Sequence, residues 1–243
     1  MEESKYEVAQ KLNQQGLELS SKGEYEQAIL SFNKILDINA KCSEAYFNIG
    51  NAYQQLGLYE KSLEYFKTGL EQEPEDSIGL YNMGNLYSLM GNSEYAIQCY
   101  NHSIRVNPAF SSVYFNKGNE LLILHRYEEA LKMYDKVIDL EQNHKGAHFK
   151  KALVLGELKK YEAANQSYYY VLMLDPDDAE TYYNKGNNLY FLDCLSEAIL
   201  CYDKAIKINP NDADFFYNKG VILTKIGKLS EAQICFNEYR RLR

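Results

Sequence analysis

The sequence predicts an all-α solenoid, a stack of seven helix–turn–helix repeats of 34 residues each. Three observations predict this fold class. Glycines recur every 34 residues, a period typical of stacked repeat arrays; they are Gly16, Gly50, Gly84, Gly118, Gly186 and Gly220, with Ala152 filling the gap in the series. All four prolines occupy the thirty-second position of a repeat. The twenty-fourth position is aromatic in every repeat.

The glycine series sets the boundaries of the repeats. They span residues 9–42, 43–76, 77–110, 111–144, 145–178, 179–212 and 213–243, and residues 1–8 extend the first helix. No linker rich in Pro, Gly or Ser and no low-complexity stretch interrupts the series. We therefore expect one continuous repeat domain from residue 9 to residue 243.

Each repeat contains two predicted helices. In the second repeat, Tyr46, Ile49 and Tyr53 form an i, i+3, i+7 stripe typical of one face of a helix. A second helix is expected from near Tyr59 until Pro74 stops it. A glycine inside a helix costs about 1 kcal/mol relative to alanine. Its regular return therefore indicates that the two helices of a repeat approach too closely for a side chain.

The combined pattern of aromatic, glycine, small and proline positions resembles the tetratricopeptide repeat (TPR). The resemblance covers residues 9–243. It implies a right-handed superhelical solenoid. It also implies a concave groove lined by the second, fifth, sixth, ninth and thirteenth positions of each repeat.

By this resemblance, carboxamides and aromatic rings line the groove. The sixth and ninth positions carry Asn48, Asn51, Asn82, Asn85, Asn116, Asn119, Asn184, Asn187 and Asn218. The fifth positions carry rings, among them Tyr81, Phe115 and Phe149. A carboxamide offers two donors and an acceptor, which suits a peptide backbone. Two interpretations stay open and are compatible: the asparagines bind a ligand, or they bond between adjacent first helices.

The middle repeats suggest a more specific hypothesis. We expect Asn82, Asn85, Asn116 and Asn119 to hold a ligand's backbone. An apolar ligand side chain would enter a patch formed by Leu89, Leu122 and Ile123, and Lys150 would meet an acidic group. The alternative is that Lys150 is merely solvated and that the apolar residues close the core between repeats.

A known subclass of the family grips a C-terminal carboxylate with a set of lysines and asparagines. Asn85, Asn116 and Lys150 match three of its five positions, whereas Tyr81 and Gly146 stand where that subclass has lysines. The leading prediction is therefore not a chaperone-tail clamp. The groove also resembles the asparagine-lined substrate groove of the O-GlcNAc transferase family. That use needs a catalytic domain, which this chain lacks.

Composition and motifs argue against several other functions. The net charge of −8 argues against a nucleic-acid partner, and no apolar run is long enough to span a bilayer. No phosphate-binding loop, dinucleotide fingerprint or hydrolase motif occurs. His144 and His148 have an i, i+4 spacing that could hold a metal on one helix, but they straddle the expected junction between repeats, and His148 stands where several other repeats have Tyr or Phe. Cys194 and Cys201 lie seven residues apart, with no third or fourth ligand at zinc-site spacing. We expect no enzyme activity, no cofactor and no metal.

The sequence thus predicts a non-catalytic adaptor or scaffold that holds an extended or helical protein segment in its groove. One alternative is a structural subunit embedded in a large assembly, for example a ciliary or cytoskeletal one. Another is a targeting or regulatory arm for an enzyme on another chain. The polar, partly acidic first residues do not resemble a signal peptide, so we expect a cytoplasmic protein.

Overall fold

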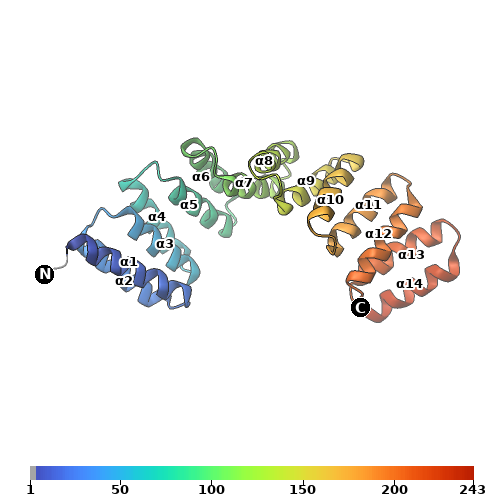
Figure 1. Ribbon diagram of the computed structural model, residues 1–243, viewed down its shortest axis with the longest axis horizontal. Coiled ribbons are helices and arrows are strands. Elements are labelled where there is room, and N and C mark those ends of the chain that lie inside the picture. The colour runs from blue at the N-terminus through green and yellow to red at the C-terminus, as the bar shows by residue number, and fades with distance from the viewer. Residues whose placement is uncertain (1–3) are drawn as a thin grey trace. The chain divides into compact units, whose positions relative to one another are not determined.

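A computed structural model describes residues 4–243, which contain fourteen α-helices and no strand (Figure 1). By the density of contacts they divide into two compact units, one ending at Leu124 and one beginning at His125. The first unit holds α1 (Lys5–Ser21), α2 (Tyr25–Ile38), α3 (Ser43–Gln55), α4 (Tyr59–Gln72), α5 (Ser77–Leu89), α6 (Ser93–Val106) and α7 (Ser111–Ile123). The second holds α8 (Tyr127–Leu140), α9 (Lys145–Glu157), α10 (Tyr161–Leu174), α11 (Ala179–Phe191), α12 (Leu195–Ile208), α13 (Ala213–Lys225) and α14 (Leu229–Leu242).

The helices confirm the predicted all-α repeat. Odd-numbered helices are the first helices of the repeats and even-numbered helices the second. The boundary between the two units lies inside the fourth repeat, between α7 and α8. α1 begins at Lys5, ahead of the first 34-residue period, and residues 1–3 of the predicted extension lie outside the described part of the chain.

Within each unit, contacts link near neighbours along the chain. Each helix packs against the next one, and consecutive first helices also touch, as α3 does with α5 and α11 with α13. This nearest-neighbour pattern is the physical basis of a repeat array. It also brings side chains about 34 residues apart into contact, which positions the candidate site.

The glycine positions lie where the two helices of a repeat come closest. Gly84 is buried, and a Cβ atom placed on it would lie 2.5 Å from Cε1 of Tyr100. Gly220 faces Phe236 in the same way, at 2.8 Å. The small twentieth position, which holds Ser62 in the second repeat, is buried in every repeat. Close packing therefore explains the mid-helix glycines, as predicted.

The helix ends also follow the prediction. α4, α6, α10 and α12 each end two residues before a proline, and α8 ends at the same point although Gln142 replaces the proline there. Asp178 then caps the next helix by accepting the N–H of Thr181 at 3.0 Å. The acidic residues around Pro176 thus belong to the turn between repeats, where Asp178 is the cap of α11.

The turn inside each repeat requires a left-handed residue at the fifteenth position. Gly23, Gly57, Gly91 and Gly227 occupy it in four repeats with φ between 72° and 79°. In the other three, His125, Lys159 and Asp193 adopt φ values of 56°, 58° and 59°. Such a backbone is unfavourable for a residue with a Cβ atom. The sequence pattern alone did not show that these three residues take the same conformation as the glycines.

We predict that Lys159→Gly stabilises the protein. Glycine adopts the left-handed region without a steric penalty, whereas other L-residues pay about 1–2 kcal/mol. After the larger loss of chain entropy for glycine, a gain of about 0.5–1 kcal/mol should remain. Thermal unfolding followed by circular dichroism should show a Tm higher by about 1–4 °C. The adjacent change Lys160→Gly is the control, because Lys160 has φ of −89°, and it should give no such increase.

Candidate functional site

The predicted groove residues lie on the first helices, which carry partly exposed carboxamides in both units. In the first unit they belong to α3, α5 and α7; in the second they belong to α9, α11 and α13. The structure divides the asparagines into two groups. Some hydrogen-bond between neighbouring repeats, and others make no hydrogen bond within the described residues.

The best-defined network joins the third and fourth repeats. Asn116 donates from Nδ2 to Oδ1 of Asn85 at 2.8 Å and to the hydroxyl of Tyr81 at 3.0 Å. Tyr100 donates its hydroxyl to the same Oδ1 of Asn85 at 2.8 Å. Burial raises the pKa of Tyr100, so this hydroxyl remains a donor at neutral pH.

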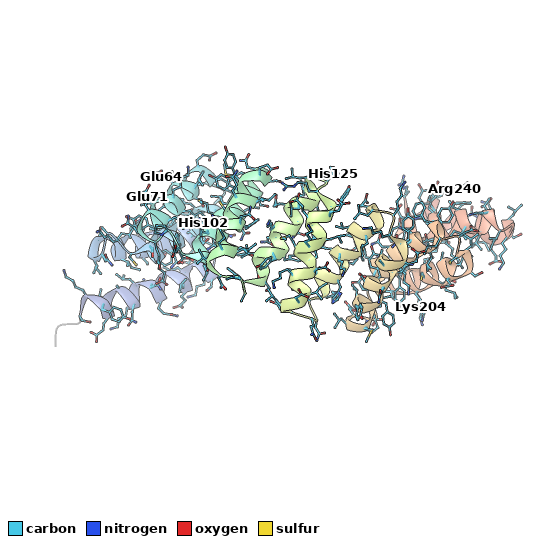
Figure 2. All side chains as sticks on the ribbon, turned by 90° about the horizontal axis from the view of Figure 1, so that it is seen from above. Glu64, Glu71, His102, His125, Lys204 and Arg240 are labelled. Carbon is cyan, nitrogen blue, oxygen red and sulfur yellow. The ribbon has the colours of Figure 1, made fainter. Side chains whose placement is uncertain are left out.

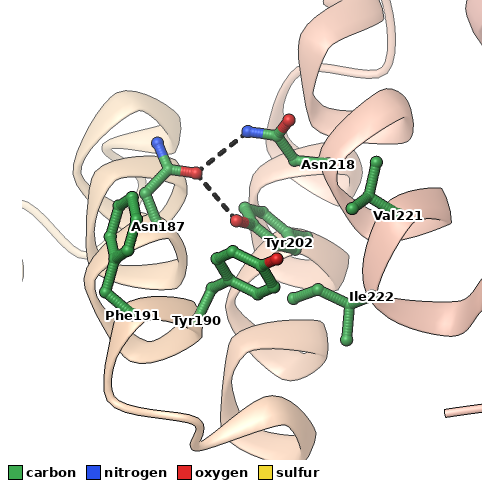
Figure 3. Close-up of a pocket in the computed structure, with 7 residues that line it drawn as sticks. All are labelled: Asn187, Tyr190, Phe191, Tyr202, Asn218, Val221 and Ile222. Atoms are coloured by element: carbon green, nitrogen blue, oxygen red, sulfur yellow. Dashed lines mark hydrogen bonds between the residues drawn. The ribbon is translucent and has the colours of Figure 1, made fainter. Parts of the chain in front are cut away.

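The same network recurs between the sixth and seventh repeats (Figure 3). Asn218 donates to Asn187 Oδ1 and to the Tyr183 hydroxyl, both at 3.0 Å, and Tyr202 donates to Asn187 Oδ1 at 2.7 Å. In both networks, the two lone pairs of one Asn oxygen and the two protons of the other Asn nitrogen are used. The Nδ2 of Asn187 and the Oδ1 of Asn218 make no hydrogen bond to a described residue, and Figure 3 shows both pointing away from Tyr202.

The equivalent pair between the second and third repeats behaves differently. Asn51 and Asn82 occupy the positions of Asn85 and Asn116, yet none of the described residues hydrogen-bonds to either side chain. The reason is the residue type of the neighbouring rings. Phe47 and Phe66 replace the two tyrosines, so no hydroxyl is available to hold the carboxamides. Both amides are partly exposed and keep their hydrogen-bonding groups available.

The remaining carboxamides fall into both groups. Asn48 donates to Oδ1 of Asn13 on α1 at 3.0 Å, so it bonds between repeats. Asn184 on α11 is partly exposed and, like Asn82, makes no side-chain hydrogen bond to a described residue. Asn119 lies partly exposed on α7. Inter-repeat bonding is therefore real for some asparagines and absent for others.

The predicted apolar patch is exposed at its centre. Leu89 at the end of α5 is 57% exposed and Ile123 at the end of α7 is 62% exposed, while Leu122 is partly buried. The two exposed residues therefore do not close the core between repeats.

The predicted aromatic residues of the first unit lie at least partly in the core. Tyr81 packs against Tyr100 and Phe110 with ring centroids 6.1 and 5.0 Å apart, and Phe115 is partly buried.

Two further predicted residues lie on α9 in the second unit. Lys150 is partly exposed on α9, and no described carboxylate lies within ion-pair distance of its ammonium group. Phe149 packs against Tyr168, with ring centroids 5.8 Å apart. The absence of an ion pair with a described residue agrees with the alternative that Lys150 is merely solvated, and its acidic ligand stays a prediction.

The second unit contains a pocket of about 320 Å³ beside the second Tyr–Asn network. Its polar rim is formed by Asn187 and Asn218, and its walls are apolar; they are formed by Tyr190, Phe191, Tyr202, Val221 and Ile222 (Figure 3). Phe191 is 63% exposed although it forms part of a wall. The pocket can accept an apolar group while its rim bonds to a polar one.

The equivalent place in the first unit holds a polar contact. There Glu120, only 4% exposed, stands where the pocket has Ile222, and it accepts a hydrogen bond from Ser88 at 2.6 Å. The sequence hypothesis did not include Tyr190, Phe191 and Val221. A signal was present, because Tyr190 and Phe191 occupy the same twelfth and thirteenth positions as the predicted apolar patch.

The rings of His144 and His148 hydrogen-bond to the backbone. Nδ1 of His144 accepts the N–H of Ala147, and Nε2 of His148 bonds to the carbonyl of Gln142 at 2.9 Å. Among residues 4–243, no group of three or more His, Cys, Asp or Glu side chains could hold a metal ion. Burial raises the pKa of Cys99 to about 11, which keeps this thiol protonated at neutral pH.

Among the helices of residues 4–243, none has the length and apolar character needed to span a membrane.

Two family models match the chain. The tetratricopeptide repeat model matches residues 43–76, 77–110 and 111–144, and a TPR repeat model matches residues 16–57 and 194–227. Among curated protein sequences, none matches the chain.

Several solved structures resemble the chain. The C-terminal part of a TPR repeat-containing protein from Cytophaga hutchinsonii has a TM-score of 0.82 and 18% identity over 94% of both chains. YrrB, described as a TPR protein with an unusual peptide-binding site, has a TM-score of 0.67 and 23% identity over 74% of this chain and 92% of its own. MamA from Desulfovibrio magneticus RS-1, from residue 41 on, has a TM-score of 0.66 and 25% identity over 69% and 95%.

Proposed function

Because the chain belongs to the tetratricopeptide-repeat family, we propose that it is a non-catalytic adaptor that binds a protein segment along its first helices. The observation that carries this proposal is the unbonded pair Asn51 and Asn82. Two partly exposed carboxamides that no neighbouring repeat engages are free to bond to a ligand. Each offers two donors and one acceptor, the groups that complement a peptide backbone.

The pocket in the second unit supports the same function with a different contribution. Its apolar walls suit one apolar side chain of a bound segment. At its rim, Nδ2 of Asn187 is a donor and Oδ1 of Asn218 an acceptor that no residue in 4–243 engages, and together they suit one peptide group. A backbone held by amides would give weak sequence preference, so this pocket is the part that we expect to select the ligand.

YrrB gives further support by analogy. It shares the fold and is described as having a peptide-binding site. Each net hydrogen bond contributes only about 0.5–1.5 kcal/mol. We therefore expect a peptide to need several carboxamides, and a typical affinity in the micromolar range, about −8 kcal/mol.

Selection of a displayed random peptide library against the full chain tests the proposal. The selected peptides should form two groups. The double change Asn51→Ala with Asn82→Ala should lower the affinity for one group, and Val221→Lys should lower the affinity for the other, in each case at least tenfold, about 1.4 kcal/mol. The variant Lys67→Ala, on the second helix α4, is the control and should leave every affinity unchanged. If the selected peptides bind both groove variants as tightly as they bind the wild type, or if no peptide is enriched, the proposed groove function is wrong.

A further inference from the structure

The second helix of the fifth repeat, α10, exposes an unusual number of apolar side chains. One face packs inward, where Ala164 and Val171 are fully buried. On the outer side Tyr169 is 55% exposed and Met173 is 61% exposed. Tyr170 beside them is 46% exposed, although its ring stacks on His148 of α9 with centroids 5.2 Å apart. The outward face of a helix in a soluble protein normally carries polar and charged residues. This face of α10 departs from that rule.

The other six repeats provide an internal comparison at the same positions. The twenty-ninth position, which is Met173 in the fifth repeat, is charged in all the others: Asp37, Glu71, Arg105, Asp139, Lys207 and Arg241. The positions of Tyr169 and Tyr170 are polar or charged in every other repeat. Figure 2 labels three of these polar residues, Glu71, His102 and Lys204, on the second helices α4, α6 and α12.

A fourth position, on the side of α10 that also carries Tyr170, is unusual as well. The nineteenth position is exposed and holds alanine only in the fifth repeat, as Ala163. Elsewhere it holds large or charged residues: Gln27, Lys61, Tyr95, Glu129, Glu197 and Glu231. Repeat five therefore combines three large apolar residues with one small residue, which lies about two turns before Tyr170, an arrangement that packing against another helix favours.

The two ends of α10 carry opposite charges. Lys159 and Lys160 are exposed just before its amino end, beside the exposed Glu162. Asp177 is exposed just after its carboxyl end, and Asp175 there already pairs with Lys145 at 2.7 Å. No described residue forms an ion pair with Lys159, Lys160 or Asp177. The net charge available for a partner is thus positive at one end and negative at the other.

We propose that the outer face of α10 binds the same face of a second copy of this chain, with the two helices antiparallel about a two-fold axis. Such an interface is isologous, so each contact occurs twice. An axis near residue 168 places Tyr169 beside its counterpart, sets Met173 of one copy over Ala163 of the other and brings Asp177 close to Lys160. One register satisfies the apolar and the charged pairs together.

A second copy is the occupant that the charges favour. The surface holds both members of the complementary pair, which a two-fold arrangement joins twice. Antiparallel helices also place opposite dipole ends together. Tyr and Met are enriched at protein interfaces, where they provide contact area. This inference is independent of ligand binding to the first helices.

Sedimentation equilibrium of the full chain at several concentrations tests the proposal. The wild type should form dimers. The variant Tyr169→Asp, Tyr170→Lys, Met173→Lys, which copies the residues of α12 at the same positions, should raise the dimer dissociation constant at least tenfold while retaining its helicity. Leu200→Lys removes another exposed apolar residue, from α12, and should leave the dimer unchanged. A wild type that stays monomeric up to about 1 mM would overturn the proposal.

Two further variants test the antiparallel register. Asp177→Lys should weaken the dimer, and adding Lys159→Glu and Lys160→Glu to it should restore the affinity, since each copy then carries the reversed pair. Tyr169→Cys should form a disulfide-linked dimer under mild oxidation, and the wild type, whose five cysteines lie elsewhere, should not. If the wild type dimerises but the triple variant does not regain its affinity, or if Tyr169→Cys forms no cross-link, the proposed packing is ruled out.

Discussion

Replacing Asn85 and Asn116 together with alanine should lower the free energy of unfolding by about 2–4 kcal/mol relative to a matched pair of substitutions. The change removes three hydrogen bonds, two made by Asn116 and one made by Tyr100. It also leaves the hydroxyl of Tyr100 without its acceptor, in a side chain that is only 1% exposed. An unpaired buried hydroxyl adds a desolvation cost to the loss of the bonds themselves.

The matched pair is Asn51→Ala with Asn82→Ala, in the equivalent positions of the preceding repeats. Alanine is the better helix former, so both variants gain the same propensity term, up to about 1 kcal/mol. Because Asn51 and Asn82 bond to no described residue, this variant should be as stable as the wild type or slightly more stable. Urea unfolding followed by circular dichroism measures the difference. Equal stabilities of the two variants would show that the Tyr–Asn network contributes nothing to folding.

Replacing Asn188 with leucine should raise the free energy of unfolding by about 1–3 kcal/mol. Asn188 on α11 is 7% exposed, and its Nδ2 is buried without a hydrogen-bond partner in residues 4–243. Leucine has a similar outline and stands at the same position in the third repeat as Leu86, which is fully buried. The substitution therefore removes an unsatisfied donor without creating a cavity.

Thermal unfolding should show this gain as a rise in Tm of about 2–4 °C for each kcal/mol. Asn184→Leu, on the same helix but partly exposed, is the control and should give no comparable rise. A lower Tm for Asn188→Leu would contradict the expectation. It would indicate that an internal water bonds to this amide in solution and that the group is satisfied after all.

The sequence was sufficient to predict the framework of the fold. The spacing of the glycines and prolines identifies both helices of every repeat, because the close approach at Gly84 and the stop before Pro108 are local effects. The left-handed turns at Lys159 and Asp193 were harder to predict. There the neighbouring helices impose a conformation that the residue type does not favour.

The candidate site could be predicted only in part. At the fifth and twenty-fourth positions, tyrosine and phenylalanine are equivalent for packing, so the pattern treats Tyr100 and Phe66 alike. The hydroxyl group, which only tyrosine has, decides whether a neighbouring asparagine is bonded or available. Reading that difference requires knowing that side chains 15, 31 and 35 residues apart meet, and this depends on how consecutive helices are rotated.

The restriction of contacts to neighbouring helices has a consequence for how the chain folds. Within each unit, packing joins consecutive helices or consecutive first helices, so few contacts bridge long stretches of sequence. Such a topology has a low contact order, and its loops close at a small entropic cost. A helix pair formed early at any point of a unit can then act as the nucleus onto which its neighbours fold one after another.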